Sequence, residues 1–139
     1  MANLVKLKNK THVPFAFRIS GNVIKTTEDT SVREIAKILS KNKIGAIIVE
    51  RKGDLAGIIS ERDIVWKVVA LDKSFDKTKA RDIMTRNVIT VDLKKGVNAL
   101  YETLKKFSFR HLPVTSGKKV IGMVSSRDLM YLRQLKTKE

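Results

Sequence analysis

The 139-residue sequence has no cysteine, only two histidines and few aromatic residues, which make up 6% of the chain. Without cysteine there can be no disulfide, no thiol nucleophile and no Cys-ligated zinc or iron–sulfur centre. His12 and His111 are too few for a histidine-based metal site, so we expect no metal. No apolar run approaches the roughly 20 residues that span a membrane. The N-terminal residues also lack the apolar core of a signal peptide, so the sequence predicts a cytoplasmic protein with no membrane partner.

Acidic residues are scarce as well. The chain has 14 Asp and Glu against 29 Lys and Arg, for a net charge of +15. A lysine enrichment of the thermophilic kind normally raises Glu together with Lys, which is not the pattern here. The excess favours a polyanionic partner, either nucleic acid or an anionic surface, over a merely solubilising role.

The basic residues that we expect to contact nucleic acid lie in both terminal segments and in several internal positions. They are Lys6, Lys8, Lys10, Arg18, Lys94, Lys95, Lys105, Lys106, Arg110, Lys118, Lys119, Arg133, Lys136 and Lys138. Because lysine predominates and aromatic stacking residues are few, such binding would be directed at the phosphate backbone rather than at bases.

An internal duplication with an offset of 65 residues runs through most of the chain. The heptapeptide GIISERD at 57–63 returns as GMVSSRD at 122–128, and the two copies align without a gap back to Asn22 and Asn87. Most other aligned positions keep their apolar character, which indicates a duplicated structural unit. Folding requires the apolar pattern but not Ser, Arg and Asp at fixed spacing after a strand. That triplet is therefore the first candidate for a ligand site.

Each copy predicts the element order β-α-β-β-α. The first copy is expected to contain a strand over Val23–Thr26, a helix after Ser31, strands over Ile44–Glu50 and Leu55–Ser60, and a helix from about Glu61 to Ala70. The second is expected to contain a strand over Val88–Val91, a helix with Val97, Leu100, Leu104 and Phe107 on one face, strands over His111–Thr115 and Val120–Ser125, and a helix near Arg127. Ser31 and Glu34 stand at capping-box spacing. Polar hairpin turns separate the last two strands of each copy.

These elements suggest five segments: a basic N-terminal extension at 1–17, a first repeat at 18–72, a linker at 73–81, a second repeat at 82–135 and a basic tail at 136–139. The N-terminal extension carries apolar residues among its lysines, which favours an added strand or a docked segment over a disordered tail. The linker is expected to be a polar connector.

The repeated turn carries groups that suit a ribonucleotide. Ser60 and its equivalent Ser125 end a strand and begin a helix, where free N–H groups and the helix dipole attract an anion. Arg62 adds a planar cation suited to phosphate. Asp63 only accepts hydrogen bonds, and the two hydroxyls of a ribose could both donate to it. The alternative is structural: Ser as the N-cap and Asp as a first-turn residue favoured by the dipole.

The doubled β-α-β-β-α order with G-x-x-S-x-R-D at the last turn resembles the tandem cystathionine-β-synthase (CBS) domain pair over residues 18–135. The resemblance implies an α+β fold in which two CBS repeats pack as a pseudo-twofold pair, the Bateman module. It also implies that AMP, ADP, ATP or S-adenosylmethionine binds in the cleft between the repeats. The first implied site comprises Ile24, Lys25, Ala46, Ile47, Ser60, Arg62 and Asp63. The second comprises Ile89, Thr90, His111, Leu112, Pro113, Ser125, Arg127 and Asp128.

The two implied sites differ in charge and polarity. Thr90 matches the hydroxyl that is usual in the family at that strand position, whereas Lys25 departs from it. Glu61 places a carboxylate beside the first phosphate site, where the second repeat has the neutral Ser126. We therefore expect the second site to hold phosphates better, unless Lys25 reaches inward and offsets Glu61. His111 either stacks on adenine or packs at the mouth of the cleft.

No catalytic set is present in the sequence: there is no Ser-His-Asp set, no Cys-His pair and no metal-ligand cluster. We therefore expect a non-enzymatic regulator that acts in trans as an adenine-nucleotide sensor. Some stand-alone CBS proteins of archaeal type bind DNA or RNA, and some bind ribosomes as hibernation factors, which the basic charge here fits. The alternatives are a nucleotide-responsive regulator of protein–protein contacts and an S-adenosylmethionine-binding pair.

CBS pairs commonly form homodimers through their helices, and the resemblance extends this expectation to the present chain. The apolar stripes that would supply the dimer face contain Trp66, Val69, Tyr131, Leu132 and Leu135. The same stripes could instead pack between the two repeats of one chain, and the sequence does not separate these alternatives.

Overall fold

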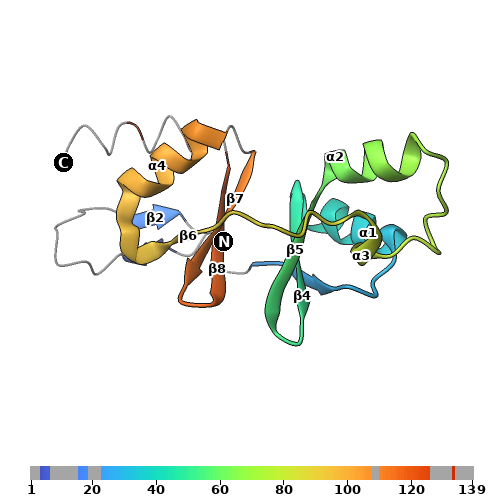
Figure 1. Ribbon diagram of the computed structural model, residues 1–139, viewed down its shortest axis with the longest axis horizontal. Helices are drawn as coiled ribbons and strands as arrows, with labels where there is room; N and C mark the ends of the chain where they lie inside the picture. The colour runs from blue at the N-terminus through green and yellow to red at the C-terminus, as the bar shows by residue number, and fades with distance from the viewer. Residues whose placement is uncertain (1–3, 7–15, 19–22, 108–109, 126–132, 134–139) are drawn as a thin grey trace. The chain divides into compact units, whose positions relative to one another are not determined.

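The computed structural model describes residues 4–6, 16–18, 23–107, 110–125 and 133. The chain divides into two compact units. The first-repeat unit is Ile24–Val88, and the second-repeat unit is Ile89–Glu139 together with Met1–Val23. Each contains its own three-stranded sheet and helices, so both repeats have the predicted α+β character (Figure 1).

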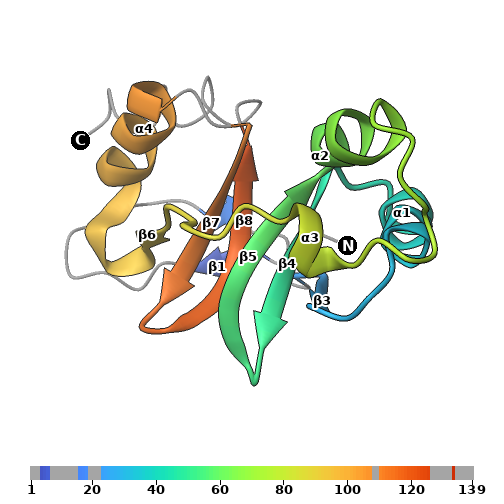
Figure 2. The same ribbon diagram turned by 45° about the vertical axis from the view of Figure 1, so that its right-hand side comes forward.

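The first-repeat unit has the sheet order β3-β4-β5, with β3 parallel to β4 and β4 antiparallel to β5. Its elements are β3 (Lys25–Thr27), α1 (Val32–Asn42), β4 (Ala46–Arg51), β5 (Asp54–Ser60), α2 (Glu61–Ile64), the π-helix η1 (Val65–Val69) and α3 (Ala80–Ile83). Helices α1 and α2 lie on the same side of the β4–β5 hairpin in both views (Figures 1 and 2).

Helix α1 begins after Ser31, as its sequence predicts. The Ser31 side chain caps it by accepting a hydrogen bond from the Glu34 N–H at 3.2 Å, which satisfies one of the free donors of the first turn. The helix ends at Lys43, whose φ of 51° is in the left-handed region. The Lys43 and Ile44 N–H groups then bond back to carbonyls of the last turn, a common way to close a helix.

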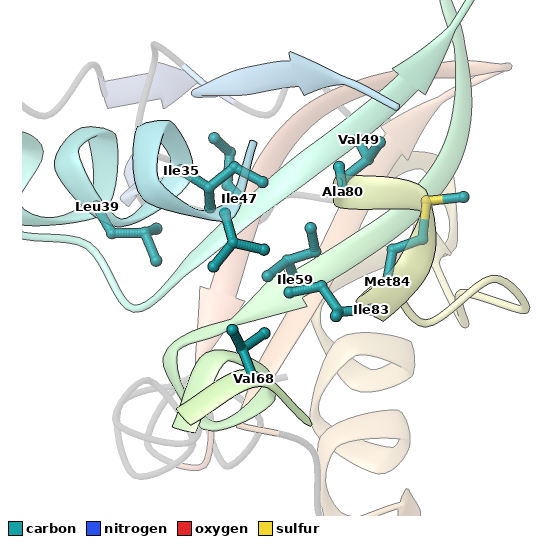
Figure 3. Packing of buried hydrophobic residues seen from close by; sticks show 10 residues of the cluster. Ile35, Leu39, Ile47, Val49, Ile59, Val68, Ala80, Ile83 and Met84 are labelled. Atoms are coloured by element: carbon teal, nitrogen blue, oxygen red, sulfur yellow. The ribbon is translucent and has the colours of Figure 1, made fainter. Parts of the chain in front are cut away.

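The core of this unit forms where α1, η1 and α3 cover one face of the sheet (Figure 3). Ile35 of α1, Ile47 of β4 and Ile59 of β5 are each 0% exposed. Because side chains alternate along a strand, Ile47 and Val49 face this core together, while Ala46 and Ile48 point to the opposite face. Burying branched aliphatic side chains contributes about 1.5–3 kcal/mol each, so this cluster is a major source of the unit's stability.

Gly57, the first residue of the repeated motif, has a packing role. A Cβ atom at this position would lie 2.8 Å from the Met84 side chain and 2.8 Å from the Thr85 carbonyl oxygen. The segment after α3 approaches β5 this closely because Thr85 and Ile58 exchange two backbone hydrogen bonds, of 2.9 and 3.1 Å. The glycine of the motif therefore serves the fold.

Residues 73–81, expected to be a polar connector, are closely tied to the first-repeat unit. The Val32 N–H donates to the Thr78 carbonyl and the Ala80 N–H donates to the Thr30 carbonyl, both at 2.9 Å. Thr78 is buried, and Ala80 and Ile83 of α3 join the core. The connector thus ends in a short helix that the sequence pattern did not predict.

The second-repeat unit repeats this arrangement with the sheet order β6-β7-β8. Its elements are β6 (Val91–Asp92), the 3₁₀-helix η2 (Leu93–Lys95), α4 (Gly96–Phe107), β7 (His111–Ser116) and β8 (Lys119–Ser125). Both hairpins have the same register, and each shifts register at the equivalent place, between Val49 and Glu50 and between Val114 and Thr115. The duplication seen in the sequence therefore extends to the strand irregularity.

Three differences from the predicted elements concern their type and extent. The strand expected over Val88–Val91 is wrong for its first three residues, because the Val88 N–H bonds to the Arg86 carbonyl at 2.9 Å and turns the chain before β6 begins. The helix expected from about Glu61 to Ala70 continues past α2 as a π-helix, in which the Ala70 N–H bonds to the Val65 carbonyl. The strand expected over Val23–Thr26 begins two residues later and is β3, Lys25–Thr27. The N-terminal segment forms β1 (Leu4–Lys6) and β2 (Ala16–Arg18), which pair antiparallel, in keeping with the expected added strand.

Candidate functional site

The turn from β5 into α2 is closed by a reciprocal capping box between Ser60 and Asp63. The Asp63 N–H donates to Ser60 Oγ at 3.3 Å, and Asp63 Oδ2 accepts from the Ser60 N–H at 2.8 Å and from Ser60 Oγ at 3.2 Å. The structural interpretation of the motif is therefore confirmed for the first repeat. The capping also fixes where the Asp63 carboxylate lies, so a ligand that uses it would meet a preformed acceptor.

Two further residues shape this turn, and sequence reasoning missed both as parts of the site. Lys67 pairs with Asp63 Oδ1 at 2.9 Å and donates to the Ile83 carbonyl at 2.9 Å. The Arg62 guanidinium lies over the Trp66 ring, 5.4 Å from its centroid. Both pairs have the i,i+4 spacing that brings side chains together on a helix. That spacing is the signal that could have identified them.

The helix start offers an anion fewer free donors than the sequence suggests. The Glu61 N–H already donates to the Gly45 carbonyl at 2.9 Å, and the Asp63 N–H donates to Ser60 Oγ. A phosphate at this turn would therefore rely more on the Arg62 side chain and the Ser60 hydroxyl than on backbone N–H groups. Arg62 is exposed and could turn from Trp66 toward such a group.

The structure brings only some of the predicted strand residues to the turn. Ala46 is the cross-strand partner of Ser60, so the two lie side by side at the end of the hairpin. Ile47 is buried in the core, and its side chain faces away from any site on the opposite face of the sheet. Ile24 is half-buried and packs against the same core. Lys25 pairs with Glu50 at 2.9 Å, so it does not offset Glu61 in this arrangement.

In the second-repeat unit the register places His111 opposite Ser125, the equivalent of the Ala46–Ser60 pair. Leu112 is 0% exposed and Pro113 is also buried, and by alternation along β7 their side chains point to opposite faces of the sheet. Thr90 is half-buried and Ile89 is exposed. Arg127 and Asp128 lie outside the described residues, as does the last predicted helix, so the second copy of the turn is described only as far as Ser125.

The predicted nucleic-acid residues fall into separate groups. Lys94 and Lys95 end the 3₁₀-helix η2 just before α4. The hydrogen bond from the Gly117 N–H to Asp92 places them at the same end of the unit as the β7–β8 turn with Lys118 and Lys119. Lys105 and Lys106 end α4, about 15 Å further along its axis at 1.5 Å per residue. Arg110 and Arg133 are exposed. The backbone of Lys6 and Arg18 lies on β1 and β2; Lys8, Lys10, Lys136 and Lys138 lie outside the described residues.

Two structural features, a metal-ligand cluster and a membrane-spanning helix, are absent from the described residues. No group of three or more His, Asp or Glu side chains in this part of the chain is arranged to hold a metal ion. No helix in the same residues is long and apolar enough to cross a membrane.

The hairpin and its bulge occur in both repeats, and comparison with known families identifies the repeated domain. The family model described as "CBS domain" matches residues 17–70 and again residues 80–134. The chain belongs to the CBS domain family. It carries two tandem CBS repeats, which is the composition of a Bateman module.

Two curated CBS relatives are similar in sequence. The mitochondrial CBS domain-containing protein CBSX3 of Arabidopsis thaliana is 35% identical over 115 residues, covering 79% of this chain and 56% of the relative. An uncharacterised protein of Methanopyrus kandleri, MK0525, is 37% identical over 111 residues, covering 78% of this chain and 57% of the relative. The chain thus spans little more than half the length of these relatives.

A solved CBS structure adds a ligand class to the comparison. The CBS domain pair of protein MJ0100 was crystallised in complex with 5′-methylthioadenosine and S-adenosyl-L-methionine. It is 32% identical to this chain with a TM-score of 0.72, covering 87% of this chain and 94% of that structure. Both ligands of that relative contain adenosine.

Proposed function

We propose that this protein is a non-catalytic, adenine-nucleotide-binding regulatory module that senses AMP, ADP or ATP and acts in trans. The observation that carries the proposal is the turn of the first repeat, in which a serine hydroxyl, an arginine and a fixed carboxylate stand beside a strand end, and whose Ser, Arg and Asp recur in the sequence of the second repeat. The adenosine ligands of the MJ0100 pair support the same ligand class. S-adenosylmethionine is the alternative ligand, since that relative binds it.

In this proposal Asp63 holds the ribose. A carboxylate has about four lone-pair directions, and Asp63 uses three for the Ser60 N–H, the Ser60 hydroxyl and Lys67. A ribose diol would take the remaining direction and displace the Lys67 or Ser60 side chain from another. Such an exchange couples ligand binding to the position of α2 and η1, because Lys67 also holds the Ile83 carbonyl. A ligand-dependent shift of α2 and η1 would change how the protein binds a partner, which is the regulatory output expected in trans.

The net charge of +15 supports a second part of the proposal, docking on nucleic acid, for example the RNA of the ribosome. The alternative is a nucleotide-responsive regulator of protein contacts with no nucleic-acid role. In either case we expect a cytoplasmic protein that binds rather than catalyses.

Ligand-dependent thermal unfolding tests the ligand class. AMP, ADP or ATP at about 100 times its Kd is expected to stabilise the folded protein by about 2.7 kcal/mol and to raise Tm by roughly 5–10 °C. GMP and GTP at the same concentrations serve as controls, and they are expected to leave Tm unchanged. A shift with S-adenosylmethionine alone would favour that alternative. No shift with any adenosine ligand would contradict the proposal.

A second copy of the chain is the partner we propose for the apolar side of the first-repeat unit. Val65, Trp66 and Val69 of the α2–η1 segment are 50–62% exposed. Beside them lies a groove of about 570 Å³ whose apolar lining includes Val32, Ala36, Ile64, Val69 and Phe75. A contiguous exposed apolar face of this kind marks an interaction site, and helix-mediated dimers are the common assembly of CBS pairs.

Sedimentation equilibrium of wild type and Trp66→Ala tests the homodimer. Buried interface tryptophans are frequent hot spots, so the substitution is expected to raise the dimer dissociation constant by about 30-fold, or roughly 2 kcal/mol. Phe107→Ala, which removes a half-exposed aromatic from the other unit, is the matched control and should leave dimerisation unchanged. A wild type that stays monomeric at all concentrations would contradict the homodimer.

A further inference from the structure

A single carboxylate joins two lysine pairs at one end of the second-repeat unit. Asp92 ends β6, and its Oδ1 accepts a hydrogen bond from the Lys94 N–H at 2.9 Å while its Oδ2 accepts from the Gly117 N–H at 3.1 Å. These two bonds hold the 3₁₀-helix η2 beside the β7–β8 turn. The same bonds, with the charges of Lys94 and Lys95, hold the pKa of the Asp92 carboxyl below its usual value. The Asp92 carboxylate links η2 to the β7–β8 turn like a clip, and it is therefore ionised at neutral pH.

The four lysines around this clip, Lys94, Lys95, Lys118 and Lys119, form what we name the Asp92 lysine cluster. All four are exposed, and none forms an ion pair with a carboxylate in the described part of the chain. Asp92 is the one carboxylate fixed among them, and both of its oxygens are engaged by backbone N–H groups. The cluster thus carries four positive charges against one negative. By contrast, five ion pairs join basic and acidic side chains within the first-repeat unit.

The first repeat shows that the fold does not need these lysines. At the duplication offset of 65, Lys94 corresponds to Asp29 and Lys119 to Asp54, while Lys95 and Lys118 correspond to Thr30 and Gly53. The first hairpin nevertheless forms with the same register and the same bulge. Two equivalent positions therefore carry opposite charges in one fold. Like charges crowded on a turn repel one another, so the presence of four lysines here points to a partner that neutralises their charge.

We propose that the Asp92 lysine cluster is a binding surface for the phosphate backbone of nucleic acid. The inference rests on the nucleic-acid part of the proposed function and assigns it to one end of one repeat. Lysine ammonium groups act as flexible point charges on phosphates, which suits backbone contact without base recognition. A membrane surface is disfavoured because none of the large exposed apolar side chains of the described residues lies within the cluster segments 92–95 and 116–119, whereas membrane-surface helices combine basic and apolar residues.

The test is a binding titration with fluorescent single-stranded RNA of about 20 nucleotides, longer than the usual site of one module, over a range of salt. The variant Lys94→Asp/Lys119→Asp installs residues that the first repeat already carries at these positions. Lys52→Asp/Lys73→Asp, at two exposed positions of the first-repeat unit, makes the same change in net charge and is the matched control. Thermal unfolding of each variant confirms that it folds.

Wild type is expected to bind with an affinity that falls steeply with salt. Losing two phosphate contacts, at about 0.7 each for a single strand, should lower the slope of log K against log[salt] by about 1.4 in the cluster variant. That corresponds to about tenfold weaker binding near physiological salt. The control variant makes the same change in net charge but keeps all four cluster lysines. Its affinity for RNA should therefore stay within about twofold of that of wild type.

Three results would overturn the inference, and they can be told apart. Equal losses of affinity in both variants would mean that RNA binds diffusely over the surface. This result would contradict the cluster as the binding surface but not the proposed nucleic-acid function. Absent or salt-independent RNA binding by wild type would contradict both the cluster and the nucleic-acid function. Binding of wild type to phosphatidylserine vesicles without binding to RNA would assign the cluster to a lipid surface instead.

Discussion

Replacing Ile47 by alanine is expected to lower the free energy of unfolding by about 2–5 kcal/mol, the range for truncating a fully buried aliphatic side chain. Ile47 is 0% exposed and lies among the side chains of α1, β5 and η1 (Figure 3). The sequence interpretation placed this residue in the nucleotide site. The structure instead predicts that the Ile47 side chain stabilises the folded unit rather than contacting a ligand.

Chemical denaturation with an unchanged m-value would measure the loss cleanly. Ile47→Val, which removes one methylene, should cost about 0.5–1.5 kcal/mol. Leu71→Ala is the control, because Leu71 is 59% exposed and its truncation should change stability by less than about 0.5 kcal/mol. A loss for Ile47→Ala no greater than that of the control would contradict the packing described for the first-repeat unit.

The sequence predicted the repeated hairpins well because their signals are local. Polar turns between β-branched runs set the strands β4, β5, β7 and β8 to within two residues. Ser31 marked the start of α1 through its capping chemistry. The duplication then doubled each signal, since an element seen in one copy could be sought at the same offset in the other. The family assignment followed from these features and is confirmed by the two CBS matches.

The misses arise where tertiary contacts decide the structure. Helix α3 has four residues, too few to show a helical period, and it forms because Ala80 and Ile83 fill the core. Strand β6 is short because a tight turn at Asn87 precedes it. Within the site, hydrophobic character alone could not tell that Ile47 faces the core while its neighbour Ala46 lies beside Ser60. That distinction depends on register, which pairing fixes.

Helix capping and ligand binding are alternative roles for the repeated Ser and Asp at the level of sequence, but in the structure one residue can serve both. In the first repeat the capping box is present, so substitution of Asp63 changes both the helix start and any ligand contact. Loss of a cap costs about 0.5–2 kcal/mol of stability. An affinity measurement alone therefore cannot distinguish a direct ribose contact from a disturbed turn. Comparison of two ligands that differ in one hydroxyl can.

Asp63→Ala and Asp128→Ala are expected to weaken AMP binding at their respective sites by at least about tenfold. A hydrogen bond to a charged group contributes about 1.5–3 kcal/mol, and each substitution removes the acceptor of the ribose hydroxyls. If the second site holds phosphates better, as Ser126 in place of Glu61 predicts, the Asp128 variant should show the larger loss. Asp54→Ala, in an exposed hairpin turn, is the control and should bind like wild type.

Calorimetric titration of these variants with AMP and with 2′-deoxy-AMP tests most directly whether the doubled turn holds a ribonucleotide. Wild type is predicted to bind AMP more tightly than its 2′-deoxy analogue, and each Asp→Ala variant to lose that preference at one site. A disturbed turn without ribose contact would weaken both ligands alike and preserve their ratio. AMP binding with the same affinity and the same preference in wild type and in both variants would contradict the assignment of the ligand to the repeated turn.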